Sequence, residues 1–128
     1  MNTRRLSVMS ALMMLLVCLA MPSFAEPSGK WRIKLNHTAE NNGTIVLRIA
    51  PVSADPIDVE TKIPANTSEN HAADILRDSL RASLGEGYHV EIDDGEDVLI
   101  KKRGKTPKFD LTLVNSSLTG LQIEIKHD

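Results

Sequence analysis

Apolar and polar residues alternate along most of this chain with a period of two residues. The pattern is clearest where Trp31, Ile33 and Leu35 alternate with basic residues. This periodicity predicts strands that have one buried face and one face in water. The predicted strands span residues 31–35, 45–49, 57–63, 88–92, 97–102, 109–114 and 121–125.

One segment follows a helical period instead. Its apolar stripe consists of Ala72, Ala73, Ile75, Leu76, Leu80 and Leu84. Asn66 suits the N-cap position, and Thr67 and Ser68 are alternative caps. Gly85 and Gly87 follow the stripe and favour the left-handed conformation that ends many helices. The segment therefore predicts one amphipathic helix between the third and fourth strands.

Turn signals suggest how these strands are connected. Asn42-Gly43 lies between the first two strands, and Asp94-Gly95 lies between the fourth and fifth, so both pairs are expected to form hairpins. With hairpin connections throughout, the sequence predicts an α+β fold. We expect an antiparallel sheet of about six to seven strands, in the order β3-α-β4, with one helix packed on its apolar face.

Residues 1–25 have the features of a secretory signal peptide. Arg4 and Arg5 provide the basic start, Leu6 to Met21 form the apolar run, and Ser23-Phe24-Ala25 is a small-x-small cleavage site. An uncleaved membrane anchor is the alternative, but the apolar run is short for a span and no basic stop follows it. We expect a mature chain of residues 26–128 that forms a single α+β domain.

The mature chain contains no cysteine, because Cys18 lies in the leader. It therefore forms no disulfide, which favours a bacterial periplasmic or secreted protein over an animal secreted one. Without Arg4 and Arg5, the net charge falls from −2 to about −4, so the composition gives no reason to expect binding to nucleic acid. The few aromatic residues also do not suggest a stacking surface.

A basic run follows the fifth strand and is the strongest charge feature of the chain. It contains Lys101, Lys102, Arg103, Lys105 and Lys108. Such a cluster is suited to an anionic surface, such as a phosphate-bearing glycan or an acidic protein. Charges at a strand end also deter edge-to-edge pairing, so a plain solvated turn is the alternative interpretation. We select these five residues as the candidate contact patch.

Other clusters have simpler explanations. The acidic turn Asp93–Asp97 could hold calcium, but it lacks the spaced ligands of a calcium loop and is better explained as a solvated hairpin tip. His71, Asp74 and Asp78 lie on one helical face and could bind zinc or serve acid-base chemistry, although an exposed helix face has the same pattern. The chain has no nucleophile elbow or phosphate-binding loop. We therefore predict no enzyme activity and no cofactor.

Part of the chain resembles a small α/β module of phage tail and tail-fibre proteins. In that module a strand ends in Ile-Pro-Ala, a capped helix follows, and a Gly-Tyr-x-Val hairpin precedes a Phe-x-Val/Leu strand. Ile63-Pro64-Ala65, Gly87-Tyr88-His89-Val90 and Phe109-Asp110-Leu111 match this order within residues 59–113, about half of the mature chain. A signal peptide departs from the phage pattern. The resemblance implies a structural or adhesive module without catalytic residues.

These observations favour an exported, soluble, non-catalytic interaction module. Its expected partner is an envelope or secreted protein, or an anionic cell-surface glycan. Two alternatives remain open at the level of sequence. The first is an assembly subunit that associates through sheet edges. The second is a small secreted hydrolase or metal-binding protein that uses His71, Asp74 and Asp78.

Overall fold

The computed structural model describes residues 26–128, so the predicted signal peptide lies outside the described residues. The described part contains seven strands, one α-helix and one short 3₁₀-helix. In chain order these are β1 (Lys30–Asn36), β2 (Gly43–Pro51), β3 (Ile57–Ile63), α2 (Glu69–Leu84), η1 (Gly85–Gly87), β4 (Tyr88–Asp93), β5 (Asp97–Lys102), β6 (Phe109–Ser116) and β7 (Gln122–His127). The predicted α+β class, with three strands before the helix and four after it, is confirmed.

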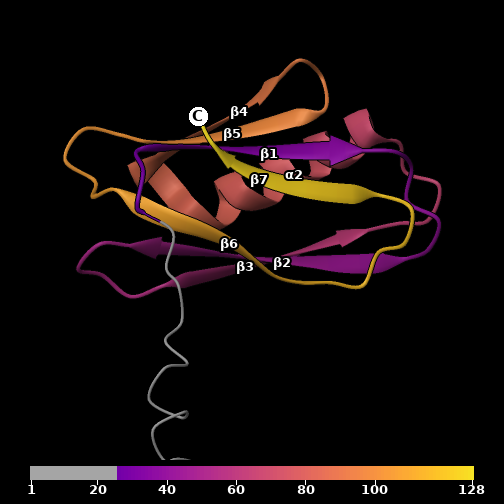
Figure 1. Cartoon of the computed structure of the whole chain (residues 1–128), viewed down its shortest axis with the longest axis horizontal. Helices are drawn as coiled ribbons and strands as arrows, with labels where there is room; N and C mark the ends of the chain where they lie inside the picture. The colour runs from indigo at the N-terminus through magenta and orange to yellow at the C-terminus, as the bar shows by residue number, and fades with distance from the viewer. Residues whose placement is uncertain (1–25) are drawn as a thin grey trace, which may run out of the picture.

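The strands form two antiparallel sheets rather than one. The first has the order β4-β5-β1-β7 and the second has the order β3-β2-β6 (Figure 1). Alternating burial could not distinguish these arrangements, because a strand with one apolar face fits either a single covered sheet or one layer of two packed sheets.

The predicted hairpin connections are wrong at three places: between β1 and β2, between β5 and β6, and between β6 and β7, because in each case the two strands lie in different sheets. β1 pairs with β5 and β7, whereas β2 pairs with β3 and β6. The connection between β1 and β2 crosses from one sheet to the other and is bound to distant parts of the chain. Ala39 N donates to Thr67 O at 2.9 Å, and Asn66 N donates to Ala39 O at 2.7 Å. Gly43 begins β2 instead of forming a tight turn.

The predicted hairpin between β4 and β5 is confirmed. Asp93 is the register partner of Asp97 across the turn. Asp94 and Gly95 both have positive φ angles, 51° and 80°, as a tight hairpin turn of this hand requires. This turn places the acidic tip at the end of the first sheet.

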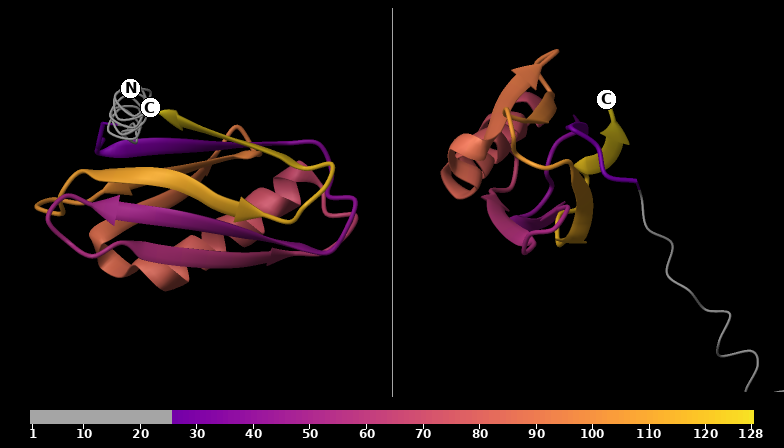
Figure 2. Two further views of the ribbon diagram at one scale, coloured as in Figure 1. Left: turned by 60° about the horizontal axis from the view of Figure 1, so that its bottom comes forward. Right: turned by 90° about the vertical axis from the view of Figure 1, so that its left-hand side faces the viewer.

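Ser68, one of the three candidate caps, is the N-cap of α2. Its Oγ accepts a hydrogen bond from His71 N at 3.3 Å. The helix ends before Gly85, whose φ of 67° suits glycine. The buried stripe of α2 packs against β3 and β4, so the helix closes one side between the two sheets (Figure 2).

The hydrophobic core lies between the two sheets and the helix. It includes Ile33 and Val98 from the first sheet, Leu47 and Phe109 from the second, and Leu76 from α2, all of them fully buried. Trp31 Nε1 donates to Phe109 O at 2.8 Å and so ties the two sheets together. On the side opposite the helix, β6 and β7 are edge strands that belong to different sheets.

Candidate functional site

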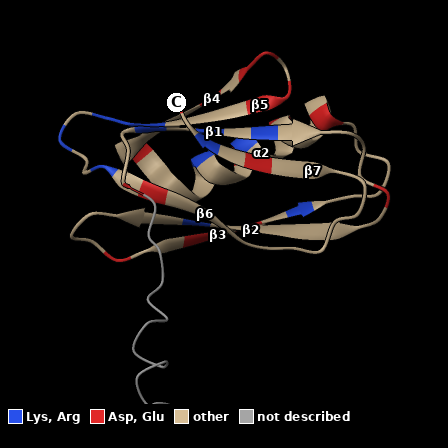
Figure 3. Cartoon of the chain, in the orientation of Figure 1, with Lys and Arg blue, Asp and Glu red and all other residues tan. Residues whose placement is uncertain are grey.

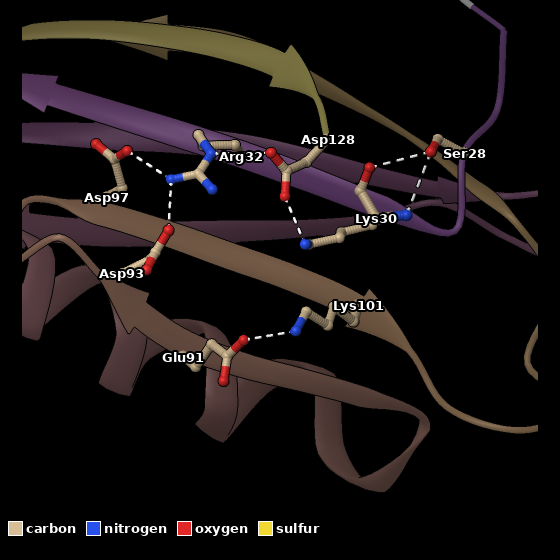
Figure 4. Close-up of polar contacts among 8 residues, drawn as sticks. All are labelled: Ser28, Lys30, Arg32, Glu91, Asp93, Asp97, Lys101 and Asp128. Carbon is tan, nitrogen blue, oxygen red and sulfur yellow. Dashed lines mark hydrogen bonds and ion pairs between the residues drawn. The ribbon is translucent and has the colours of Figure 1, made fainter.

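A network of charged side chains covers the outer face of the four-stranded sheet. Arg32 on β1 lies at its centre and contacts three carboxylates (Figure 4). Its Nη1 lies 2.7 Å from Asp97 Oδ2 and 2.9 Å from Asp93 Oδ2, and its Nε lies 3.0 Å from Asp128 Oδ1. The network therefore joins three elements: the hairpin tip, β1 and the end of the chain.

These contacts change the proton affinity of the groups involved. Hydrogen bonds that Arg32 donates to Asp128, Asp97 and Asp93 raise the pKa of Arg32 above its usual value. Lys30 Nζ lies 2.6 Å from Asp128 Oδ2, and hydrogen bonds from Lys30 and Arg32 lower the pKa of Asp128 to about 2. Arg32 and Asp128 are therefore both ionised at neutral pH.

Asp97 is the most buried carboxylate of this network, with 4% of the residue exposed. Its Oδ2 is bound by Arg32, and its Oδ1 has no hydrogen-bond partner among the described residues. The next residue on this outer face is Leu99, which is also buried. Its register partners are Arg32 and Glu91, and the aliphatic stems of such long side chains can cover an apolar neighbour. The network thus has a clear structural role.

Two of the four carboxylates of the acidic turn belong to this network. Asp93 and Asp97 both contact the Arg32 guanidinium, which supplies the positive charge that a calcium ion would otherwise bring. Within residues 26–128, no group of three or more His, Cys, Asp or Glu side chains is arranged to hold a metal ion.

His71, Asp74 and Asp78 lie on the exposed surface of α2. Arg77 pairs with Asp78 at 3.0 Å and with Asp74 at 3.5 Å, so both carboxylates have a basic neighbour on the same helix. The arrangement is that of a solvated helix face.

The five residues of the predicted basic patch have different environments. Lys101 Nζ is paired with Glu91 at 2.7 Å, and Lys102 Nζ donates to Gly104 O at 3.1 Å. Arg103 Nη2 lies 3.0 Å from Nδ1 of His89. Lys105 and Lys108 are exposed, and no carboxylate within the described residues pairs with them. The charge of Lys101 is thus partly neutralised by Glu91, while the other four cations keep theirs.

Residues 103–108, here called the basic loop, are held at both ends by backbone hydrogen bonds. Arg103 N donates to Gly87 O, and Val52 N donates to Lys108 O, both at 2.9 Å. Within the loop, Thr106 N donates to Arg103 O at 3.0 Å. The loop therefore presents its charges from a fixed backbone. Figure 3 shows it in blue at one end of the molecule, with the acidic hairpin tip at the other end of β5.

A shallow recess adjoins the basic loop. Arg81 from α2, His89 from β4 and Arg103 line it together with Glu86 and several apolar or backbone groups. Arg81 and His89 were not part of the sequence prediction. Their separation along the chain concealed them, since only the packing of α2 against β4 brings Arg81 to this place. A larger recess of the described chain lies elsewhere, beside the end of β1 and the starts of β5 and β7, and its lining mixes Lys34 with acidic residues.

The Arg32 network was also missed by reasoning from sequence. Arg32 was one of several basic residues on a polar strand face, and Asp128 was only the last residue. A weak signal existed at Asp97, a carboxylate that begins the apolar run of β5. A charged side chain at the start of a buried strand indicates an ion-pair partner nearby, because burying an unpaired charge is unfavourable.

Among residues 26–128, no helix is long and apolar enough to cross a membrane. Neither a model of a known protein family nor a curated protein matches this sequence.

Proposed function

We propose that this protein is an exported, non-catalytic binding module whose basic loop contacts an anionic partner. The partner would be an acidic surface of an envelope or secreted protein, or an anionic cell-surface glycan. The observation that supports this proposal is a group of cations at the loop that no carboxylate of residues 26–128 pairs with: Lys102, Arg103, Lys105 and Lys108.

The local geometry favours a binding role over simple solvation. A flexible loop would lose conformational freedom on binding, but this loop is already held by a hydrogen bond from Arg103 N to Gly87 O and by one from Val52 N to Lys108 O. The recess beside Arg103 adds the basic side chains Arg81 and His89. A partner that carries phosphate or carboxylate groups would therefore meet the guanidinium groups of Arg81 on α2 and Arg103 on the loop, with the His89 ring of β4 beside them.

The charge distribution also favours an oriented encounter. The acidic tip at Asp93–Asp97 and the basic loop lie at opposite ends of β5. An anionic partner would be attracted to one end of the molecule and repelled by the other, and such steering accelerates association. The interaction would weaken as salt rises, because exposed charges are screened over about 8 Å at physiological ionic strength.

The test is a crosslinked capture experiment, in which the purified protein captures its partner from the envelope and medium of its own organism. Capture by the wild type is compared with capture by two variants. K105Q/K108Q neutralises the two lysines of the loop, both of which are exposed, and K62E on the exposed face of β3 is its control. Both variants change the net charge by the same amount. If each contact contributes about 0.7 kcal/mol, K105Q/K108Q lowers partner affinity about tenfold, whereas K62E leaves it unchanged.

Equal capture by the wild type and K105Q/K108Q at low salt would overturn the proposal. A second arm measures binding to a purified phosphate-bearing glycan. If the protein binds this glycan and the binding depends on Lys105 and Lys108, the partner is the glycan. If the protein does not bind the glycan but still captures a protein, the partner is that protein.

A further inference from the structure

The two sheets have four edge strands, and three of them have blocked edges. α2 packs against both β3 and β4. Ser79 Oγ donates to Glu60 O of β3 at 3.3 Å, and Arg81 Nε donates to Val90 O of β4 at 2.9 Å. Side chains of the helix thus occupy backbone acceptors that a further strand would need.

β6 is blocked by other means. Ser28 exchanges two backbone hydrogen bonds with Phe109, at 2.9 and 3.0 Å, and so covers the start of the edge. Leu111 N instead donates to the carboxylate of the preceding residue, Asp110. Farther along, the register shifts by one residue at Val114, and such a bulge disturbs the regular spacing that strand pairing requires.

β7 differs from these three strands. Its inner edge pairs with β1, and Asp128 N donates to Lys30 O there. In an antiparallel ladder, successive residues direct their backbone groups alternately to the two sides. Ile123, Ile125 and His127 therefore direct their N–H and C=O groups outward, and no described residue bonds to them. Among residues 26–128, β7 is therefore a regular edge strand that no other element pairs with on its outer side.

We propose that β7 pairs antiparallel with β7 of a second copy of this chain, about a two-fold axis at Ile125. This pairing goes beyond the proposed function and does not depend on the basic loop. Ile125 would face Ile125 of the second copy as a hydrogen-bonded pair, because its backbone groups point outward. Ile123 would face His127 of the second copy in the same way. The two four-stranded sheets would become one continuous sheet across the dimer.

Charge complementarity selects a second copy as the partner. In this register Glu124 lies opposite Lys126 of the second copy, and Lys126 lies opposite its Glu124. These are non-hydrogen-bonded positions, where facing side chains approach most closely. Glu124 and Lys126 already lie on one face of β7, with Nζ and Oε1 3.3 Å apart. An edge with this alternation is therefore complementary to itself when reversed.

The test uses charge variants at Glu124 and Lys126 in sedimentation velocity from micromolar to millimolar concentration. Wild type is expected to show reversible, concentration-dependent dimers, with fast exchange because one strand pair is smaller than a standard interface. E124K places lysines opposite one another, and K126E does the same with glutamates, so each variant alone is expected to lose at least half of the dimer at matched concentration.

The decisive step is to mix the two single variants. An equimolar mixture of E124K and K126E restores opposite charges in the heterodimer, so dimers are expected to return. The double variant E124K/K126E is likewise complementary to itself and is expected to dimerise. Equal urea midpoints for all variants would show that the substitutions do not affect folding. If one single variant fails to fold, the double variant still tests the pairing.

Two results would overturn this proposal. One is that the wild type stays monomeric at every concentration. The same result is expected if the β7 edge pairs only with a peptide of another protein. The other is a wild-type dimer that is insensitive to both single variants, because it would place the interface elsewhere. Neither result bears on binding by the basic loop.

Discussion

Arg32 Nη1 lies 2.7 Å from Asp97 Oδ2 on the outer face of the four-stranded sheet. The Asp97 side chain is 5% exposed and that of Arg32 is 18% exposed, so water stabilises neither charge well. Removing one partner of such a pair leaves the other charge buried and uncompensated. Arg32 has two further carboxylates, whereas the described residues offer the Asp97 carboxylate only Arg32. The two residues are therefore not equivalent to mutation.

We expect Arg32→Met to be more destabilising than Asp97→Asn. R32M should lower the free energy of unfolding by about 3 kcal/mol, since Asp97 then remains charged and unpaired. D97N should lower the free energy of unfolding by less than R32M does, because Arg32 keeps its contacts with Asp93 and Asp128. R32M/D97N should be more stable than the sum of the two single losses predicts. Urea unfolding with an unchanged m value measures all three, and additive losses would show that the pair does not interact.

Much of the fold was predictable because local patterns define local elements. Trp31, Ile33 and Leu35 fixed the inward face of β1, and the turn at Asp94-Gly95 fixed the β4–β5 hairpin. Strand pairing over long distances was not predictable. The segment after β1 is held by Thr67 and Asn66, which lie near the start of α2, and nothing in its own composition reveals these bonds.

The candidate site was likewise predictable where it depends on neighbouring residues, and not where it depends on contacts between distant ones. A run of basic residues indicated the basic loop directly, because clustered charges in a turn remain on the surface. Only the pairing of β4 with β5 shows that Glu91 reaches Lys101. The other four cations have no carboxylate partner within the part of the chain that the structure describes. The export of the protein and the resemblance to phage tail modules remain predictions.

Stability should decrease as the pH falls from about 4 towards 2. The pKa of Asp128 is lowered from 3.8 to about 2 by hydrogen bonds from Lys30 and Arg32. A lowered pKa in the folded state means that the ionised form stabilises folding above the unfolded pKa, and that this contribution is lost as protons bind. D128N should therefore unfold at lower urea at pH 6 and approach the wild type at pH 2. Urea midpoints across this range test the prediction, and parallel curves would contradict it.

Ser68→Ala should destabilise α2 by removing its N-cap. Ser68 Oγ accepts a hydrogen bond from His71 N, one of the helix donors that have no partner within the helix. The expected loss is about 1 kcal/mol. Ser83→Ala is the matched control, because Ser83 is exposed within the same helix and alanine favours helices. Thermal unfolding by circular dichroism compares them, and similar melting temperatures would argue against the cap.

Gly120→Ala should cost much more than Gly104→Ala, although both glycines have positive φ angles, 85° and 49°. A Cβ at Gly104 would meet no atom within 4 Å, so only backbone strain of about 1 kcal/mol applies. A Cβ at Gly120 would clash with the backbone oxygen of Thr38. The neighbouring bond from Glu40 N to Thr119 O, at 2.9 Å, holds the two segments together. We therefore expect G120A to cost about 3 kcal/mol in urea unfolding. Equal losses in the two variants would show that the turn before β7 can move away from Thr38.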